Sequence, residues 1–211
     1  MFDTLLPAGV TLSVLGEPLT DPASVAEAGL VSGMATARLR DFATGRRCAH
    51  NALRLHGVDA PWVGRQPGGA PMWPAGFVGS ITHCDGVYAA AVARAREYRA
   101  LGIDAEPIRD IPDDLADFLE RDDEREQRRD GSDPHIALLR FSAKESVFKA
   151  WSPLTGTWLD FADVSVKFAE DGAFVAQVHH PLALTHRLRF MSGRWGIADG
   201  TAYTAIAVPQ C

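Results

Sequence analysis

The chain has 211 residues, of which 46% are hydrophobic, so it can bury the core of a single compact unit. Its formal net charge of −6 gives no basic field to attract nucleic acid, and we expect no nucleic-acid partner. No apolar run approaches the roughly 18 residues that cross a bilayer, and the N-terminus lacks the basic-then-apolar order of a signal peptide. We therefore expect a cytoplasmic protein with no membrane partner.

The cysteines carry no sign of a disulfide framework. Cys48, Cys84 and Cys211 lie far apart, and their number is odd, which fits reduced thiols in the cytosol. Cys48 is expected to be a small buried side chain. Cys84 follows His83, but we do not expect the two to form a nucleophilic pair.

The first half of the chain predicts helix followed by strands. Alanine-rich spacing predicts helix within residues 23–56, with Gly57 as its stop. Residues 64–79 contain five glycines and three prolines, which predicts a loop. Residues 87–93 predict a buried strand, and residues 100–105 its antiparallel neighbour.

The second half predicts helix plus antiparallel sheet. Residues 121–130 mix charges at helical spacing, which predicts a solvated helix or, alternatively, a contact for a protein partner. A helix is predicted over 136–151, followed by strands at 164–168, 174–178, 188–190 and 202–208. The pattern as a whole predicts an α+β fold.

Two carboxylates end the predicted strand at residues 101–107. Side chains alternate along a strand, so Asp104 and Glu106 share one face while Ile103 and Ala105 point the other way. Like charges this close raise each other's pKa unless a cation neutralises them, and oxygen ligands suit Mg²⁺. The alternative is a solvated strand end with two unrelated acids.

The predicted helix over 136–151 carries charge beside aromatic rings. Glu145 and Lys149 are four residues apart and share a helix face, and Phe141 and Phe148 lie close enough to shield them from water. The alternative is an ordinary surface ion pair, which stabilises a helix by only about 0.3–0.5 kcal/mol.

Together these segments resemble the signature of 4′-phosphopantetheinyl transferases. The first part is Gly102-Ile103-Asp104-Ala105-Glu106, and the second runs from Phe141 to Trp151 and includes Lys144, Glu145 and Lys149. Trp73-Pro74, the stretch from Gly79 to Cys84, Arg38 and Arg46 resemble further positions of the monomeric class that includes the surfactin- and enterobactin-synthetase activators.

The resemblance implies a single domain, residues 1–211, of two pseudo-symmetric halves, roughly 1–106 and 107–211. Each half has a small antiparallel sheet packed on helices, with the active site between them. It implies a monomeric enzyme that transfers 4′-phosphopantetheine from coenzyme A to a serine hydroxyl of an apo acyl or peptidyl carrier protein. That carrier can be a domain of a polyketide, nonribosomal peptide or fatty acid synthase, and siderophore biosynthesis, antibiotic biosynthesis and fatty-acid assembly are alternative pathways that the sequence leaves open.

The resemblance also implies roles for individual residues. Mg²⁺, with Mn²⁺ as a substitute, would be held by Asp104, Glu106 and Glu145. Lys144 is expected to contact the pyrophosphate, Lys149 to contact phosphate or only to orient Glu145, and Glu145 to act as general base directly or through a bound water. The residues expected to bind coenzyme A are Arg38, Arg46, Arg65, Ser80, Thr82, His83 and Lys144.

Two other functions and two docking surfaces remain open. The alternatives to transfer are a coenzyme A-binding sensor or scaffold and a Mg²⁺-dependent coenzyme A phosphohydrolase. For the carrier, we favour the apolar loop of Met72, Trp73 and Phe77 over a basic surface around Arg187, Arg189 and Arg194.

Overall fold

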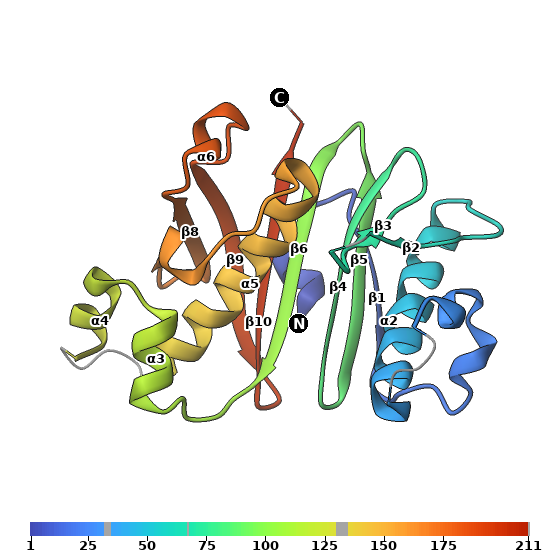
Figure 1. Ribbon diagram of the computed structural model, residues 1–211, viewed down its shortest axis with the longest axis horizontal. Coiled ribbons are helices and arrows are strands. Elements are labelled where there is room, and N and C mark those ends of the chain that lie inside the picture. The colour runs from blue at the N-terminus through green and yellow to red at the C-terminus, as the bar shows by residue number, and fades with distance from the viewer. Residues whose placement is uncertain (32–34, 67, 130–134, 211) are drawn as a thin grey trace.

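The computed structural model describes residues 1–31, 35–66, 68–129 and 135–210, so Cys211, Pro67 of the glycine/proline stretch and the end of the charge-dense segment lie outside the described residues. Two antiparallel sheets stand side by side, and each carries a long helix (Figure 1). The helices and 3₁₀ turns are α1 (Phe2–Leu5), η1 (Pro22–Ser24), η2 (Ala26–Val31), α2 (Thr36–Leu55), α3 (Asp113–Leu119), α4 (Asp122–Arg129), α5 (Ile136–Thr155), η3 (Phe161–Asp163) and α6 (Leu182–Thr185). The strands are β1 (Thr11–Leu15), β2 (Gly64–Arg65), β3 (Pro71–Met72), β4 (Phe77–Cys84), β5 (Val87–Arg94), β6 (Tyr98–Pro107), β7 (Val164–Phe168), β8 (Ala173–Val178), β9 (Phe190–Ala198) and β10 (Thr201–Pro209).

The first sheet has the order β1-β5-β4, and the second has the order β6-β10-β9-β8-β7. Helix α2 buries one side of the first sheet through residues such as Cys48 and Leu53, which pack with Tyr88 and Val92. Helix α5 covers the second sheet, where Trp151 is fully buried. The predicted α+β class and the two halves are confirmed. Among the described helices, none combines the length and apolar character needed to cross a bilayer.

Most predicted elements form, with shifted boundaries. The helical stretch predicted from residue 23 is two 3₁₀ turns followed by α2, which ends before Gly57 in a left-handed conformation, φ +82°. Helix α5 continues four residues beyond the predicted end, to Thr155. Strand β9 shares only Phe190 with the strand predicted at 188–190 and continues to Ala198; it contains Gly193, where a side chain would collide with the ring of Phe174. Glycine weakens the alternation that identifies a strand.

The predicted pairing of residues 87–93 with residues 100–105 is wrong. Strand β5 pairs with β1 and β4, whereas β6 pairs with β10 and therefore belongs to the second sheet. The two sheets divide the chain before β6, ahead of the expected boundary at residue 106. In Figure 1, β6 and β4 run next to each other through the middle of the molecule.

A glycine explains why β6 joins the second half. A Cβ atom built on Gly102 would lie 1.9 Å from the backbone oxygen of Ser146, so the backbones of β6 and α5 approach each other directly at this point. No other residue type allows this approach. The contact brings the face of α5 that carries Lys149 against Asp104 on β6.

We predict that Gly102→Ala destabilises the protein by on the order of 3 kcal/mol or more, because either the strand or the helix backbone must move. Chemical denaturation measures the free energy of unfolding. Gly29→Ala is the matched control, because nothing lies within 4 Å of its added Cβ. Equal stabilities of the two variants would contradict the close approach.

Candidate active site

Side chains join the two sheets where β4 lies beside β6. The Ser80 hydroxyl oxygen accepts a hydrogen bond from the backbone N–H of Ile103 at 3.0 Å, and the Thr82 hydroxyl donates to Asp104 Oδ1 at 3.1 Å. Lys149 reaches across from α5, and its ammonium donates to Asp104 Oδ1 at 2.7 Å, to Thr82 Oγ1 at 3.2 Å and to the carbonyl of Ile103 at 3.0 Å. Residues from β4, β6 and α5 therefore meet at one carboxylate.

The three predicted carboxylates influence each other at this junction. Burial and then the charge of Asp104 raise the pKa of Glu106 to about 7. Burial also raises the pKa of Glu145, and Asp104 adds to the shift while Lys149 opposes it. Asp104 is 4% exposed, and its Oδ2 is buried without a hydrogen-bond partner among the described residues. Such a buried oxygen calls for a donor or a cation.

The expected metal triad is not assembled as a ready-made site. Within the described ranges, no three His, Cys, Asp or Glu side chains lie close enough together to hold a metal ion. Asp104 Oδ1 is occupied by Lys149, so the ion pair of Lys149 is with Asp104 and not a surface pair with Glu145. The chemistry of the donors still fits a hard cation, because a bound dication would stabilise the charged form of two carboxylates whose pKa values are raised by burial and, to a smaller extent, by the charge of Asp104.

The side chain of Lys144 is not free to make the contact with pyrophosphate that the sequence predicted. It is 2% exposed, and its ammonium donates to Glu124 Oε2 at 2.6 Å, to the Leu119 carbonyl at 2.8 Å and to the Phe161 carbonyl at 3.2 Å. An ammonium has three N–H donors, and all three are used. The expectation that Lys144 contacts the pyrophosphate is therefore corrected: Lys144 anchors α5 to α3, α4 and η3.

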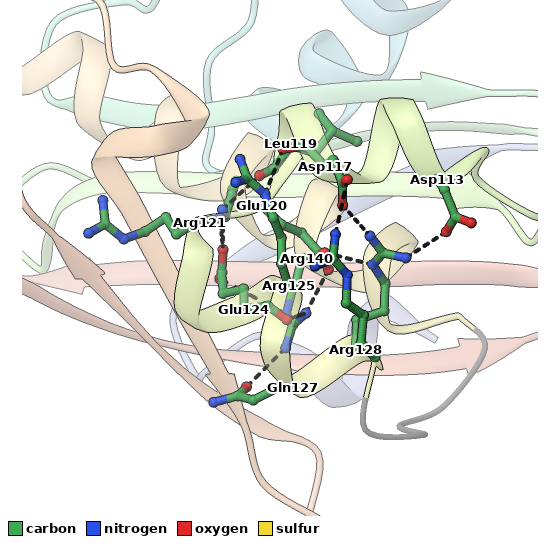
Figure 2. A network of polar contacts seen from close by, with 12 residues as sticks. Asp113, Asp117, Leu119, Glu120, Arg121, Glu124, Arg125, Gln127, Arg128 and Arg140 are labelled. Carbon is green, nitrogen blue, oxygen red and sulfur yellow. Dashed lines mark hydrogen bonds and ion pairs between the residues drawn. The ribbon is translucent and has the colours of Figure 1, made fainter.

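The charged segment that contains α4 is also less solvated than predicted. Figure 2 shows the network in which Glu120 binds both Arg128, at 2.8 Å, and Arg140, at 2.6 Å. Glu124 is buried, and its Oε1 accepts from the backbone N–H of Val166 at 2.7 Å. The carboxylates of this segment join α3 and α4 to the helix that carries Glu145.

A cavity of about 540 Å³ opens at the junction of the two sheets. It takes cationic side chains from the first half and the Asp104–Lys149 pair from the second, and it brings together all the expected coenzyme A residues except Lys144. The sequence did not single out Asp41 or Ser152 and gave Phe42 no role in the site, and all three also line it, as does Phe148, which was expected only to shield Glu145 and Lys149. The expected residues in its wall are Arg38, Arg46, Arg65, Ser80, Thr82 and His83.

Arg46 is held firmly in the cavity wall. It is 5% exposed, its Nε donates to the Val63 carbonyl at 3.0 Å, and its Nη2 donates to the Gly64 carbonyl at 3.1 Å. Burial lowers its pKa to about 10, a shift that the charge of Glu27 opposes. Its other N–H groups have no acceptor among the described residues, which leaves them available to an anion in the cavity.

His83 and Cys84 lie at the end of β4 with different properties. The ring of His83 stacks on that of Tyr88, and His83 Nε2 lies 3.7 Å from Asp41 Oδ2. Burial lowers the pKa of His83, so at neutral pH its imidazole serves as a neutral hydrogen-bonding group. Burial, followed by the charge of Glu106, raises the pKa of Cys84 to about 11. A thiol with this pKa is not a nucleophile at neutral pH.

Comparison with known proteins identifies the family. The model of the 4′-phosphopantetheinyl transferase N-terminal domain matches residues 26–93, and the model of the 4′-phosphopantetheinyl transferase superfamily matches residues 100–202. The chain is 41% identical to 4′-phosphopantetheinyl transferase Npt of Nocardia iowensis, over 98% of this chain and 99% of that protein. The chain belongs to the 4′-phosphopantetheinyl transferase family.

Other members of the family agree. The chain is 44% identical to 4′-phosphopantetheinyl transferase Svp of Streptomyces mobaraensis, over 99% of this chain and 89% of that protein. It is 36% identical to 4′-phosphopantetheinyl transferase PptT of Mycobacterium tuberculosis, over 86% of this chain and 84% of that protein. This 4′-phosphopantetheinyl transferase is thus an enzyme that transfers phosphopantetheine to carrier proteins, with coenzyme A as co-substrate, as the resemblance implied.

We predict that Glu106→Gln stabilises the metal-free protein at pH 8. The pKa of Glu106 is about 7 in the folded state, above the 4.5 of an unperturbed glutamate, so this group makes folding less favourable as the pH rises from about 4.5 to 7. The glutamine removes a cost of about 1–3 kcal/mol at pH 8 and little at pH 5. Urea denaturation at both pH values in the presence of a chelator measures the difference.

The control for this measurement is Glu126→Gln, an exposed carboxylate on α4. A stability difference between Glu106→Gln and wild type that is the same at pH 5 and pH 8 would contradict the raised pKa.

Proposed function

We propose that the enzyme binds coenzyme A in the cavity between its halves and transfers 4′-phosphopantetheine with Mg²⁺ held by Asp104, Glu106 and Glu145. The observation that carries this proposal is that one cavity has Arg38, Arg46, Arg65 and His83 in its first-half wall and the Asp104–Lys149 pair in its second-half wall. Coenzyme A carries anionic groups at two separate points, the 3′-phosphate and the pyrophosphate. The volume falls in the usual range for a ligand of this size, about 300–1,000 Å³.

In the proposed reaction, the serine oxygen of the carrier bonds to the phosphorus next to pantetheine, and the bridging P–O bond of the pyrophosphate breaks. Adenosine 3′,5′-bisphosphate leaves with the electron pair, and the serine proton passes to a base. A bound Mg²⁺ would supply positive charge to the pyrophosphate and to the departing oxygen. The ammonium of Lys149, beside Asp104, adds to that charge from the protein side.

Glu145 is our candidate for the base. Its pKa is raised by burial, so the carboxylate holds a proton more readily than a solvated glutamate does, which suits a general base near neutral pH. Its helix is fixed by the contacts of Lys144, the preceding residue, to Glu124 and two carbonyls. A role as metal ligand is compatible with this position.

The cavity walls come from one chain, which supports a monomeric enzyme. The thiols of Cys48 and Cys84 are free, as expected in the reducing cytoplasm, where we place the enzyme. The rival functions, a coenzyme A sensor and a phosphohydrolase, have no observation in their favour.

We predict that Asp104→Ala or Glu145→Ala lowers turnover by ~10²-fold or more at saturating Mg²⁺, because each change removes negative charge that would hold the cation. Mass spectrometry of an apo carrier incubated with coenzyme A and Mg²⁺ measures the product. Glu170→Ala removes an exposed carboxylate and is the control. Turnover near that of wild type in either site variant would refute the assignment.

For the carrier, we propose a groove that differs from both surfaces expected from the sequence. Two of the three apolar side chains in the expected loop are engaged: the Trp73 ring covers Gly79, and the Arg94 guanidinium lies 4.5 Å from the centre of the Phe77 ring. A groove of about 400 Å³ lies instead along α3 and the start of α5. Its lining includes Arg109, Ile111, Leu115, Phe118, Phe141 and Phe161.

Contacts between aromatic rings extend from this groove towards the carboxylate of Glu145. Phe118 is 66% exposed, and its ring centre lies 6.3 Å from that of Phe161, which in turn lies 5.8 Å from that of Phe141. Phe141 is one helical turn before Glu145 on α5. At the other edge, Arg109 reaches towards Glu106 at 3.9 Å and offers a positive charge to the acidic surface around a carrier's serine.

We predict that Phe118→Ala raises KM for the carrier by about tenfold, because it removes an exposed aromatic anchor, while KM for coenzyme A stays within about twofold. The control is Leu184→Ala, an exposed apolar residue on α6. The rate should change little with salt. A steep loss of rate with salt, together with an unchanged Phe118→Ala variant, would favour the basic surface around Arg189 and Arg194.

A further inference from the structure

Glu27 is a fully buried carboxylate that belongs to none of the expected sites. It lies in η2, and its Oε1 accepts hydrogen bonds from His50 Nε2 at 2.8 Å and from the backbone N–H of Val63 at 2.6 Å. Its Oε2 is buried and has no hydrogen-bond partner among the described residues. Burying an ionisable group is unfavourable unless other contacts compensate, so its position calls for an explanation.

The segment that Glu27 holds is the same segment that holds Arg46. The N–H of Val63 binds Glu27, while the carbonyls of Val63 and Gly64 accept from Nε and Nη2 of Arg46. Val63 is therefore fixed at both of its peptide groups. His50 is four residues after Arg46 on α2, so Glu27 contacts the same face of the helix that presents Arg46.

The next residue along this segment, Arg65, also lines the cavity. The charges of Arg46 and Arg65 repel each other, and the charge of Glu27 counteracts the repulsion, without a direct ion pair to Arg46. A segment held by the Glu27 carboxylate thus carries one arginine and supplies the acceptors that direct the other.

We infer that Glu27 is a positioning residue that fixes the Val63–Arg65 segment and thereby makes the enzyme select nucleotides that carry a 3′-phosphate. The inference rests on the proposed binding of coenzyme A in this cavity, and it assigns the 3′-phosphate to the remaining N–H groups of Arg46. Glu27 does not touch the nucleotide: it acts through the backbone of Val63 and Gly64. A positioning role predicts a loss of discrimination between substrates, whereas a purely structural role would lower stability and affect both substrates equally.

The experiment compares coenzyme A with 3′-dephospho-coenzyme A. In Glu27→Ala, KM for coenzyme A should rise by about tenfold, because the acceptors that direct Arg46 are no longer fixed. KM for the dephospho substrate and kcat for both should stay within about twofold. Glu27→Gln keeps an oxygen that can accept from Val63, and we expect it to restore most of the discrimination, leaving a loss of about threefold.

Two further variants complete the design. Arg46→Ala tests the proposed phosphate contact directly. Glu120→Gln removes a buried carboxylate from the other half, where it binds Arg128 and Arg140, and should leave the ratio of the two KM values unchanged. Thermal denaturation of all variants shows which of them are folded.

The outcomes separate the inference from the function on which it rests. If Arg46→Ala discriminates as strongly as wild type, the proposed phosphate contact fails, and the role of Glu27 fails with it. If Arg46→Ala loses discrimination while folded Glu27→Ala keeps it, only the role of Glu27 is overturned. If Glu27→Ala does not fold, the Glu27→Gln variant decides the question. Discrimination as strong as that of wild type in Glu27→Gln would then overturn the role of Glu27.

Discussion

The site depends on one partly buried ion pair, between Asp104 and Lys149. Asp104 comes from β6 and Lys149 from α5, and both contact Thr82 of β4, so the pair connects the second half of the molecule to the first. A buried ion pair is not a strong source of stability, because removing two charges from water offsets most of their attraction. Its value here is geometric: it places an acidic residue and an ammonium at the junction of the two sheets.

The two ends of the cavity wall are built by different physical means. On the first-half side, Arg46 is held by backbone carbonyls and also lies 4.6 Å from the centre of the Phe42 ring. On the second-half side, α5 is fixed by the close approach at Gly102 and by the three bonds of Lys144. Arg46 and Lys149, which line the cavity, are therefore held in place by contacts outside it.

The sequence predicted the local features of the site well. Alternation along β6 separated Asp104 and Glu106 from Ile103 and Ala105, and Ile103 and Ala105 pack together in a hydrophobic cluster while the charge of Asp104 acts on Glu106. Helical spacing placed Glu145 and Lys149 on one face of α5. Both inferences need only the geometry of a single element, which is why they succeed from a single sequence.

Predictions failed where the partner of a residue lies far along the chain. Nothing near Lys144 indicates that its ammonium binds Glu124, twenty residues earlier, and a lysine in a motif with acidic residues was more simply assigned to phosphate. The hydrogen-bonded partner of β6 is β10, about a hundred residues later in the chain. The short connection between β5 and β6 therefore led to the wrong prediction that these two strands pair. Nothing in the sequence pattern singled out Glu27, because its hydrogen-bond partners, His50 on α2 and Val63 just before β2, lie far along the chain.

Because the cavity takes its walls from both sheets, a chain with only one half folded has an incomplete cavity, and so an incomplete form of the coenzyme A site that we propose. A ligand that binds only the complete state shifts the folding equilibrium towards it by mass action. Bound coenzyme A would then hold the two halves of the enzyme together. The concentration of coenzyme A would thereby influence the lifetime of a newly made enzyme molecule.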